Sequence, residues 1–156
     1  ESQRVQVQEL LDGVPHALDN EVEQGFRPFI HTVLEKNLPE SYREMAPQIA
    51  HALMVEANRH GLDPMFLLAV VKTESRFNPK ANGRHGDSGL MQILPTTGNW
   101  LAKKLKMETP VNLHNPIINI QIGAAHFANT SRYRPARPDS WPGFRDRYFL
   151  DGQPKD

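Results

Sequence analysis

The chain contains no cysteine, so neither a disulfide framework nor a thiolate metal site can form. It also has no excess charge of either sign, because 18 Lys and Arg residues balance 18 Asp and Glu residues. This balance gives no indication of a basic surface that binds nucleic acid or of a polybasic segment that binds a membrane surface. No apolar run approaches the roughly 20 residues of a membrane-spanning helix. We therefore expect a protein with no nucleic-acid partner and no membrane-spanning segment.

The length of the chain, 156 residues, suits a single domain with a substantial hydrophobic core. The sequence starts at Glu1 rather than Met and shows no signal peptide. We therefore expect a processed or shortened chain.

Helical periodicity recurs along the sequence, whereas strand-like alternation does not. Apolar residues at helical spacing predict a helix over 21–38, with Pro28 at a start or a kink. The capping-box pattern from Ser41 to Glu44 predicts the start of a second helix, and Gly61 suits the position after its end. The fold class predicted from these patterns is all-α.

Two cap-plus-proline pairs predict further helix starts. Asp63-Pro64 begins a helix that runs from 64 to about 75, and Asn115-Pro116 begins another. A helix is also expected over 95–106. After Asn129 the composition changes, because residues 131–156 hold four prolines and five arginines. We divide the chain into a lead and peripheral helix over 1–40, a compact domain over 41–130 and an irregular tail over 131–156.

Glu74 is the main candidate for catalysis. It continues the apolar stripe of Leu67, Val70 and Val71, so we expect it to point toward the interior. Its place at a helix C-terminus and its apolar neighbours should raise the pKa of its carboxyl. A carboxylic acid that stays protonated near neutral pH is what a general acid in glycoside cleavage requires. The alternative is a helix-terminal glutamate that simply reaches solvent.

Three ordered blocks of sequence surround this residue. They are Glu-Ser-x-Phe-Asn-Pro-x-Ala (74–81), Gly-x-x-Gly-Leu-Met-Gln-Ile-x-Pro-x-Thr (86–97) and Asn-Pro-x-x-Asn-Ile-x-x-Gly (115–123). Together they resemble the lytic transglycosylase domain over about residues 45 to 128. The resemblance implies a lysozyme-like helical fold that acts on the glycan strands of bacterial peptidoglycan. A periplasmic or envelope-associated location follows from that substrate, and the resemblance leaves open which envelope machinery, if any, is a partner.

The resemblance also implies roles for individual residues. Glu74 is the catalytic acid, and Ser75 orients it by hydrogen bonding. Met91 lies along the sugar-binding groove, with core packing as the alternative, and Gln92 contacts the substrate. Asn119 supports the groove from behind. No histidine pair has metal-ligand spacing and no phosphate-binding loop is present, so we expect no metal and no cofactor.

The implied reaction is cleavage of the β-1,4 bond between N-acetylmuramic acid and N-acetylglucosamine, with formation of 1,6-anhydro ends. Asp87 leaves a second reading open, because it is either a turn residue or a carboxylate that positions water for a lysozyme-like hydrolase. The sequence departs from the family in lacking its Tyr-Asn segment near the C-terminus. That absence favours a third reading, a peptidoglycan-binding module without turnover.

Overall fold

The computed structural model describes residues 17–130, 149–150 and 153–154. Within these residues the helices are α2 (Ala17–Asn37), the short 3₁₀ helix η1 (Glu40–Met45), α3 (Ala46–His60), α4 (Pro64–Ser75), α5 (Pro95–Lys104) and α6 (Pro116–Asn129). Two strands of two residues each, β1 (Phe149–Leu150) and β2 (Gln153–Pro154), pair antiparallel. The all-α prediction is therefore confirmed. Most of the predicted lead and tail lies outside the described residues.

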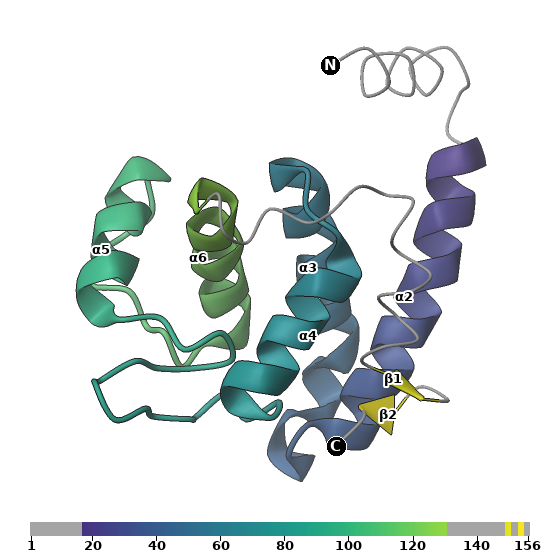
Figure 1. Cartoon of the computed structure of the whole chain (residues 1–156), viewed down its shortest axis with the longest axis horizontal. Coiled ribbons are helices and arrows are strands. Elements are labelled where there is room, and N and C mark those ends of the chain that lie inside the picture. Colours follow the sequence, from purple (N-terminus) through teal and green to yellow (C-terminus); the bar gives the residue numbers. More distant parts are fainter. Residues whose placement is uncertain (1–16, 131–148, 151–152, 155–156) are drawn as a thin grey trace.

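Helix α3 is central to the fold. It packs against α2, α4 and α6, and α5 packs against α6. Figure 1 shows α5 and α6 on one side of α3 and α2 on the other, with the long loop between α4 and α5 below α6. Among the described helices, none combines the length and the hydropathy needed to cross a bilayer.

One hydrophobic core joins the α-helices, and η1 packs partly buried side chains against it. Ile30 and Leu34 from α2 have 0% exposed surface, as do Leu53 of α3, Leu67 of α4 and Ile120 of α6. Burying a side chain of this size contributes about 1.5–3 kcal/mol to folding. Helix α2 therefore shares the core of the predicted 41–130 domain, and the division of the chain at residues 40 and 130 stays a prediction.

The predicted helix ends around α4 and α6 are confirmed. The side chain of Asp63 accepts the N–H of Met65 at 2.8 Å, which caps α4, and Pro64 follows in its first turn. The side chain of Asn115 accepts the N–H groups of Ile117 and Ile118, which caps α6. Gly61 ends α3 in the left-handed conformation at φ 63°. These caps satisfy amide groups that a helix end would otherwise leave unpaired.

The prediction at Ser41 is wrong. Residues 40–45 form η1, and no side chain caps its start. Helix α3 begins at Ala46, with Pro47 in its first turn. A proline has no N–H, and its ring clashes with the carbonyl four residues earlier, so an α-helix cannot run unbroken from Ser41 through Pro47 without distortion. Of the two alternatives for Pro28, the helix start is wrong, because this residue lies inside α2, and the kink stays a prediction.

Candidate active site

Glu74 lies in the last turn of α4, and its side chain is exposed. The prediction that it points into the interior is therefore wrong. Leu67 and Val71 on the same stripe are fully buried, as expected. The helix ends one residue after Glu74, so no later turn covers the carboxyl, and it reaches the molecular surface. A carboxyl in this position is open to a polymer that approaches from solvent.

The pKa of the Glu74 carboxyl is raised, first by partial burial and second by the negative charge of Asp87. The predicted direction is confirmed, and Asp87 adds to it. Asp87 is held in the loop between α4 and α5, where its Oδ1 accepts the N–H of His85 at 3.2 Å and its backbone carbonyl accepts the N–H of Gly83 at 2.7 Å. These are the contacts of a turn residue. They also fix a second carboxylate close enough to act electrostatically on Glu74.

Left-handed backbone conformations occur directly after the candidate acid and again in the turn that contains Gln92. Arg76 and Phe77, which directly follow α4, have φ values of 50° and 63°, and Gln92 has a φ of 52°. Residues other than glycine pay about 1–2 kcal/mol for this conformation. Such conformations persist where the surrounding structure holds them, and they cluster at functional sites. Phe77 is only 2% exposed, so burial of its ring offsets the cost at that position.

Asn119 fixes the turn that follows this loop. Its side chain has no exposed surface, and its Nδ2 donates to the carbonyls of Ser88 and Leu113, both at 2.9 Å. Its Oδ1 accepts the N–H of Met91 at 2.8 Å. Three hydrogen bonds made by one buried amide tie α6 to the turn. The role of Asn119 in supporting a sugar-binding groove stays a prediction.

Gly89 makes this close approach possible. Its φ is +81°, and a Cβ at this position would lie 2.1 Å from the carbonyl oxygen of Leu113 and 2.2 Å from Nδ2 of Asn119. Both the conformation and the lack of space exclude a larger residue without a shift of the backbone.

The structure places the remaining predicted residues at different depths. Met91 is 1% exposed and packs against Gly123, where an added Cβ would lie 2.4 Å from the methionine sulfur. Ser75 is 6% exposed, and its hydroxyl donates to the carbonyl of Val71 at 3.0 Å, not to Glu74. For Met91 this geometry favours the alternative of core packing. The contact of either residue with substrate stays a prediction.

Gln92 is half-buried, and its Nε2 donates to the carbonyls of Ala81 at 3.1 Å and Gly89 at 3.0 Å. Among the described residues its Oε1 accepts no hydrogen bond. That oxygen is therefore available as an acceptor for a sugar hydroxyl or amide.

Leu94 was not among the predicted residues. It is the N-cap of α5, two residues after Gln92, and it is 42% exposed. The apolar surface of this segment thus comes from Leu94 and not from Met91. The proline after Leu94 signals a helix start. It does not signal the exposure of the residue before it, because Asp63, which also precedes a helix-starting proline, is buried.

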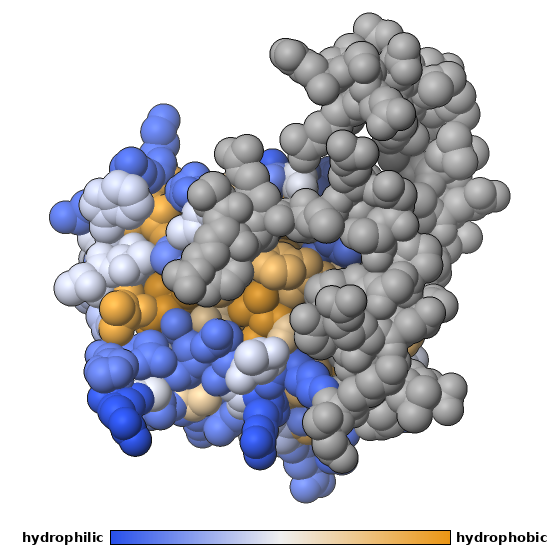
Figure 2. All heavy atoms as spheres, in the orientation of Figure 1, coloured by the Kyte–Doolittle hydropathy of each residue, from blue (hydrophilic) through white to orange (hydrophobic). Residues whose placement is uncertain are grey.

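Figure 2 shows hydrophobic side chains toward the middle of the face that it presents and hydrophilic ones along the lower edge, over the loop between α4 and α5. Within the described ranges, no group of three or more histidine or acidic side chains is placed to hold a metal ion.

Comparison with known proteins identifies the family of the chain. Residues 52–138 match the family described as the Transglycosylase SLT domain. The chain therefore belongs to that family, and the resemblance seen in the three sequence blocks is confirmed.

Two relatives show how much of a longer protein the chain spans. The membrane-bound lytic murein transglycosylase C of Edwardsiella ictaluri is 32% identical over 103 residues, which are 64% of this chain and 29% of that protein. The soluble lytic murein transglycosylase of Escherichia coli is 27% identical over 120 residues, 70% of this chain and 18% of that protein. A solved structure of an inactive mutant of the lytic transglycosylase Slt from Pseudomonas aeruginosa matches 72% of this chain and 19% of that one, with 24% identity and a TM-score of 0.48. The chain thus spans less than a third of each of these proteins.

Proposed function

We propose that this chain is a peptidoglycan lytic transglycosylase that cleaves the β-1,4 bond between N-acetylmuramic acid and N-acetylglucosamine. The observation that carries the proposal is the state of Glu74, an exposed carboxyl at the end of α4 whose pKa is raised. It lies at the start of the three sequence blocks, all of which fall within the matched residues 52–138. Both relatives described above are named lytic murein transglycosylases.

In this mechanism Glu74 acts twice. The protonated carboxyl first donates its proton to the glycosidic oxygen, so that the leaving sugar departs with a hydroxyl while positive charge develops at the anomeric carbon. The resulting carboxylate then accepts the proton of the muramyl C6 hydroxyl, whose oxygen attacks the anomeric carbon. The product carries a 1,6-anhydro ring, no water is consumed and Glu74 ends protonated. An attacking group within the same molecule has a large effective concentration.

Hydrolysis is a second candidate, favoured by one observation. The charge of Asp87 acts on Glu74, so two carboxyl groups share the site. Most glycoside hydrolases use such a pair, with one group as the acid and the other activating water or attacking the sugar. The contacts of Asp87 within its own turn make the transglycosylase reaction the better supported of the two.

The substrate determines where the enzyme acts. Peptidoglycan lies outside the cytoplasmic membrane, so we propose a location in the periplasm or cell envelope. Glycan strands are the proposed partner.

The products of digestion test the proposal. Purified peptidoglycan digested in water labelled with heavy oxygen should yield anhydromuropeptides that carry no label. Labelled reducing ends would establish hydrolysis and overturn the transglycosylase reaction. If a folded protein released no soluble product, the remaining interpretation would be a peptidoglycan-binding module without turnover.

The variant Glu74→Gln tests the assigned acid. Glutamine keeps the shape of the side chain but has no proton to transfer, so the rate should fall by about 10²- to 10⁴-fold or more. Glu35→Gln, which changes an exposed carboxyl on α2, is the matched control and should retain full activity. Because Glu74 is exposed, both variants should unfold at the same denaturant concentration as the parent. Substantial turnover in folded Glu74→Gln protein would refute the assignment.

A further inference from the structure

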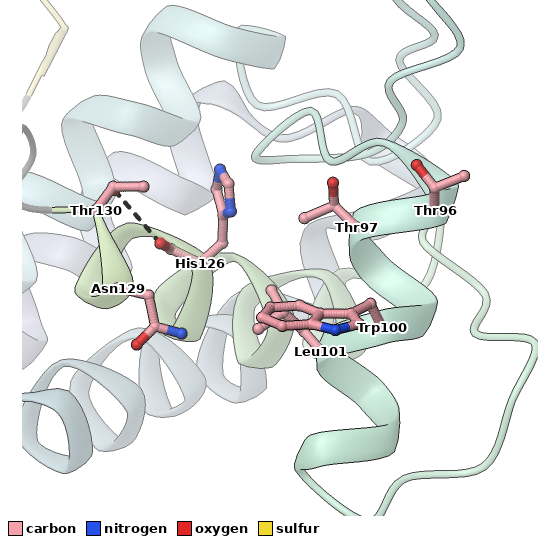
Figure 3. A pocket seen from close by; sticks show the side chains of 7 residues that line it. All are labelled: Thr96, Thr97, Trp100, Leu101, His126, Asn129 and Thr130. Carbon is pink, nitrogen blue, oxygen red and sulfur yellow. Dashed lines mark hydrogen bonds between the residues drawn. The ribbon is translucent and has the colours of Figure 1, made fainter.

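A cavity of about 440 Å³ lies between α5 and α6, and the proposed mechanism does not use it. Its volume falls within the range of about 300–1,000 Å³ that is typical of small-molecule sites. Seven residues line it (Figure 3): Thr96, Thr97, Trp100, Leu101, His126, Asn129 and Thr130.

Trp100 provides an aromatic surface in this cavity. It is 54% exposed, the largest exposed fraction among the exposed large hydrophobic residues of the described chain. Figure 3 shows its ring lying across the cavity, with Thr97 and His126 on one side of the ring plane. The Nζ atom of Lys104, one turn further along α5, lies 3.9 Å from the ring centroid. One face of the indole therefore interacts with an ammonium group, and the ring borders the cavity.

The polar residues among the seven that line the cavity are uncharged. The three threonines and Asn129 supply hydroxyl and amide groups, and no Asp, Glu, Lys or Arg is among the seven lining residues. Burial lowers the pKa of His126 below its ordinary value, so its imidazole is neutral near pH 7 and offers one donor and one acceptor. An anion would find no cation among these lining residues. A neutral ligand with hydroxyl and amide groups would find partners for both.

Two of the residues that line the cavity come shortly after the candidate site residues in the sequence. Thr96 and Thr97 lie in the first turn of α5, and the exposed Leu94 separates them from Gln92. A glycan strand is a polymer, so its binding surface extends beyond the bond that is cleaved. An N-acetylated sugar ring presents a C–H face suited to an indole and an edge of hydroxyl and acetamido groups.

We propose that the cavity between α5 and α6 binds one N-acetylated sugar of the glycan strand through residues that take no part in the proposed cleavage. Trp100 stacks on the C–H face of the ring, and Thr97 and His126 hydrogen-bond to its polar edge. This inference rests on the proposed function for the choice of ligand, but it concerns binding and not cleavage.

The test measures binding in protein that cannot turn over. The β-1,4-linked tetramer of N-acetylglucosamine is titrated into Glu74→Gln protein by calorimetry, with and without Trp100→Ala. Removing the indole should weaken binding by about five- to tenfold, as expected for a central aromatic contact. Thr97→Val, which keeps the shape and removes the hydroxyl, is a second variant and should also weaken binding. Leu105→Ala removes an exposed apolar side chain that directly follows α5 and lies outside the cavity, and it should leave the affinity unchanged.

Each outcome separates this inference from the proposed function. Equal affinities in the Trp100→Ala, Thr97→Val and Leu105→Ala proteins, or no binding in the Glu74→Gln parent, would overturn the sugar site even if peptidoglycan is cleaved. A free stem peptide that binds through Trp100 when the sugar tetramer does not would overturn it as well. Loss of sugar affinity in Trp100→Ala alongside a wild-type chain that cleaves nothing would support the sugar site and reject the proposed reaction.

Discussion

The side-chain oxygen of Asn119 accepts the backbone N–H of Met91 at 2.8 Å, and this bond joins α6 to the turn that follows the Asp87 loop. The same amide group donates to the carbonyls of Ser88 and Leu113. Because the side chain has no exposed surface, water cannot replace any of these three bonds. The position of the turn relative to Glu74 therefore depends on a residue that does not need to touch the substrate.

Asn119→Asp should destabilise the fold and lower activity together. Aspartate keeps the acceptor for Met91 but loses both donors, so two carbonyl oxygens face a buried carboxylate. Each unsatisfied buried group costs about 1–3 kcal/mol, and we expect a total loss of about 3 kcal/mol or more in the free energy of unfolding. Urea denaturation at neutral pH measures it.

Asn112→Asp is the matched control for that variant. The Oδ1 of Asn112 accepts the N–H of His114 in an exposed turn, and aspartate keeps this acceptor. The free energy of unfolding should change by no more than about 0.5 kcal/mol. If Asn119→Asp proved as stable as this control, the hydrogen bonds of Asn119 would not hold the turn.

Local signals in the sequence predicted the helix ends well. Asp63 and Asn115 precede prolines, and the cap bonds that they make lie within three residues of each. Such geometry depends on neighbouring residues alone, so a short stretch of sequence contains it. The failure at Ser41 has the same origin, because the capping-box pattern was read without the effect of Pro47 on the helix that follows.

The candidate site was predicted only in part, because its geometry depends on distant contacts. Periodicity showed that Glu74 continues the stripe of Leu67 and Val71. It could not show that α4 ends so soon after Glu74 that no later turn covers the carboxyl. The depth of Met91 depends on Gly123, which lies 32 positions later in the sequence. The cavity beside Trp100 needs α5 and α6 to pack together, and no local pattern encodes that contact.

Asp63 should make stability depend on pH. Burial raises the pKa of its carboxyl from 3.8 to about 6, although the N–H groups of Met65 and Phe66 partly oppose the shift. The folded state therefore binds the proton more tightly than the unfolded state. The resulting stabilisation is fully present below about pH 4 and is lost as the pH rises through about 6.

Asp63→Asn isolates this effect. Asparagine keeps the acceptor that caps α4 and carries no charge, so this part of the pH dependence should disappear. Compared with the parent, the variant should gain stability between pH 4 and 7 in urea denaturation. Asp63→Ala removes the cap itself and should lose about 0.5–2 kcal/mol. Identical pH profiles for the parent and Asp63→Asn would show that this carboxyl does not titrate in that range.

Asp87→Asn should shift the pH profile of activity. The negative charge of Asp87 helps to raise the pKa of Glu74, and asparagine removes that charge while keeping the acceptor for His85. The pKa of Glu74 should then fall, so the protonated acid is lost at lower pH and the alkaline limb of kcat/KM moves to lower pH. The shift should shrink at high salt, because Glu74 is exposed and screening weakens its interaction with Asp87.

Glu35→Gln is the control. It removes one negative charge from α2, which lies on the other side of α4 from this loop, and should leave the alkaline limb in place (Figure 1). An alkaline limb that stays where it was in folded Asp87→Asn protein would mean that another group controls the profile, whereas complete loss of turnover would favour a direct role for Asp87 in activating water.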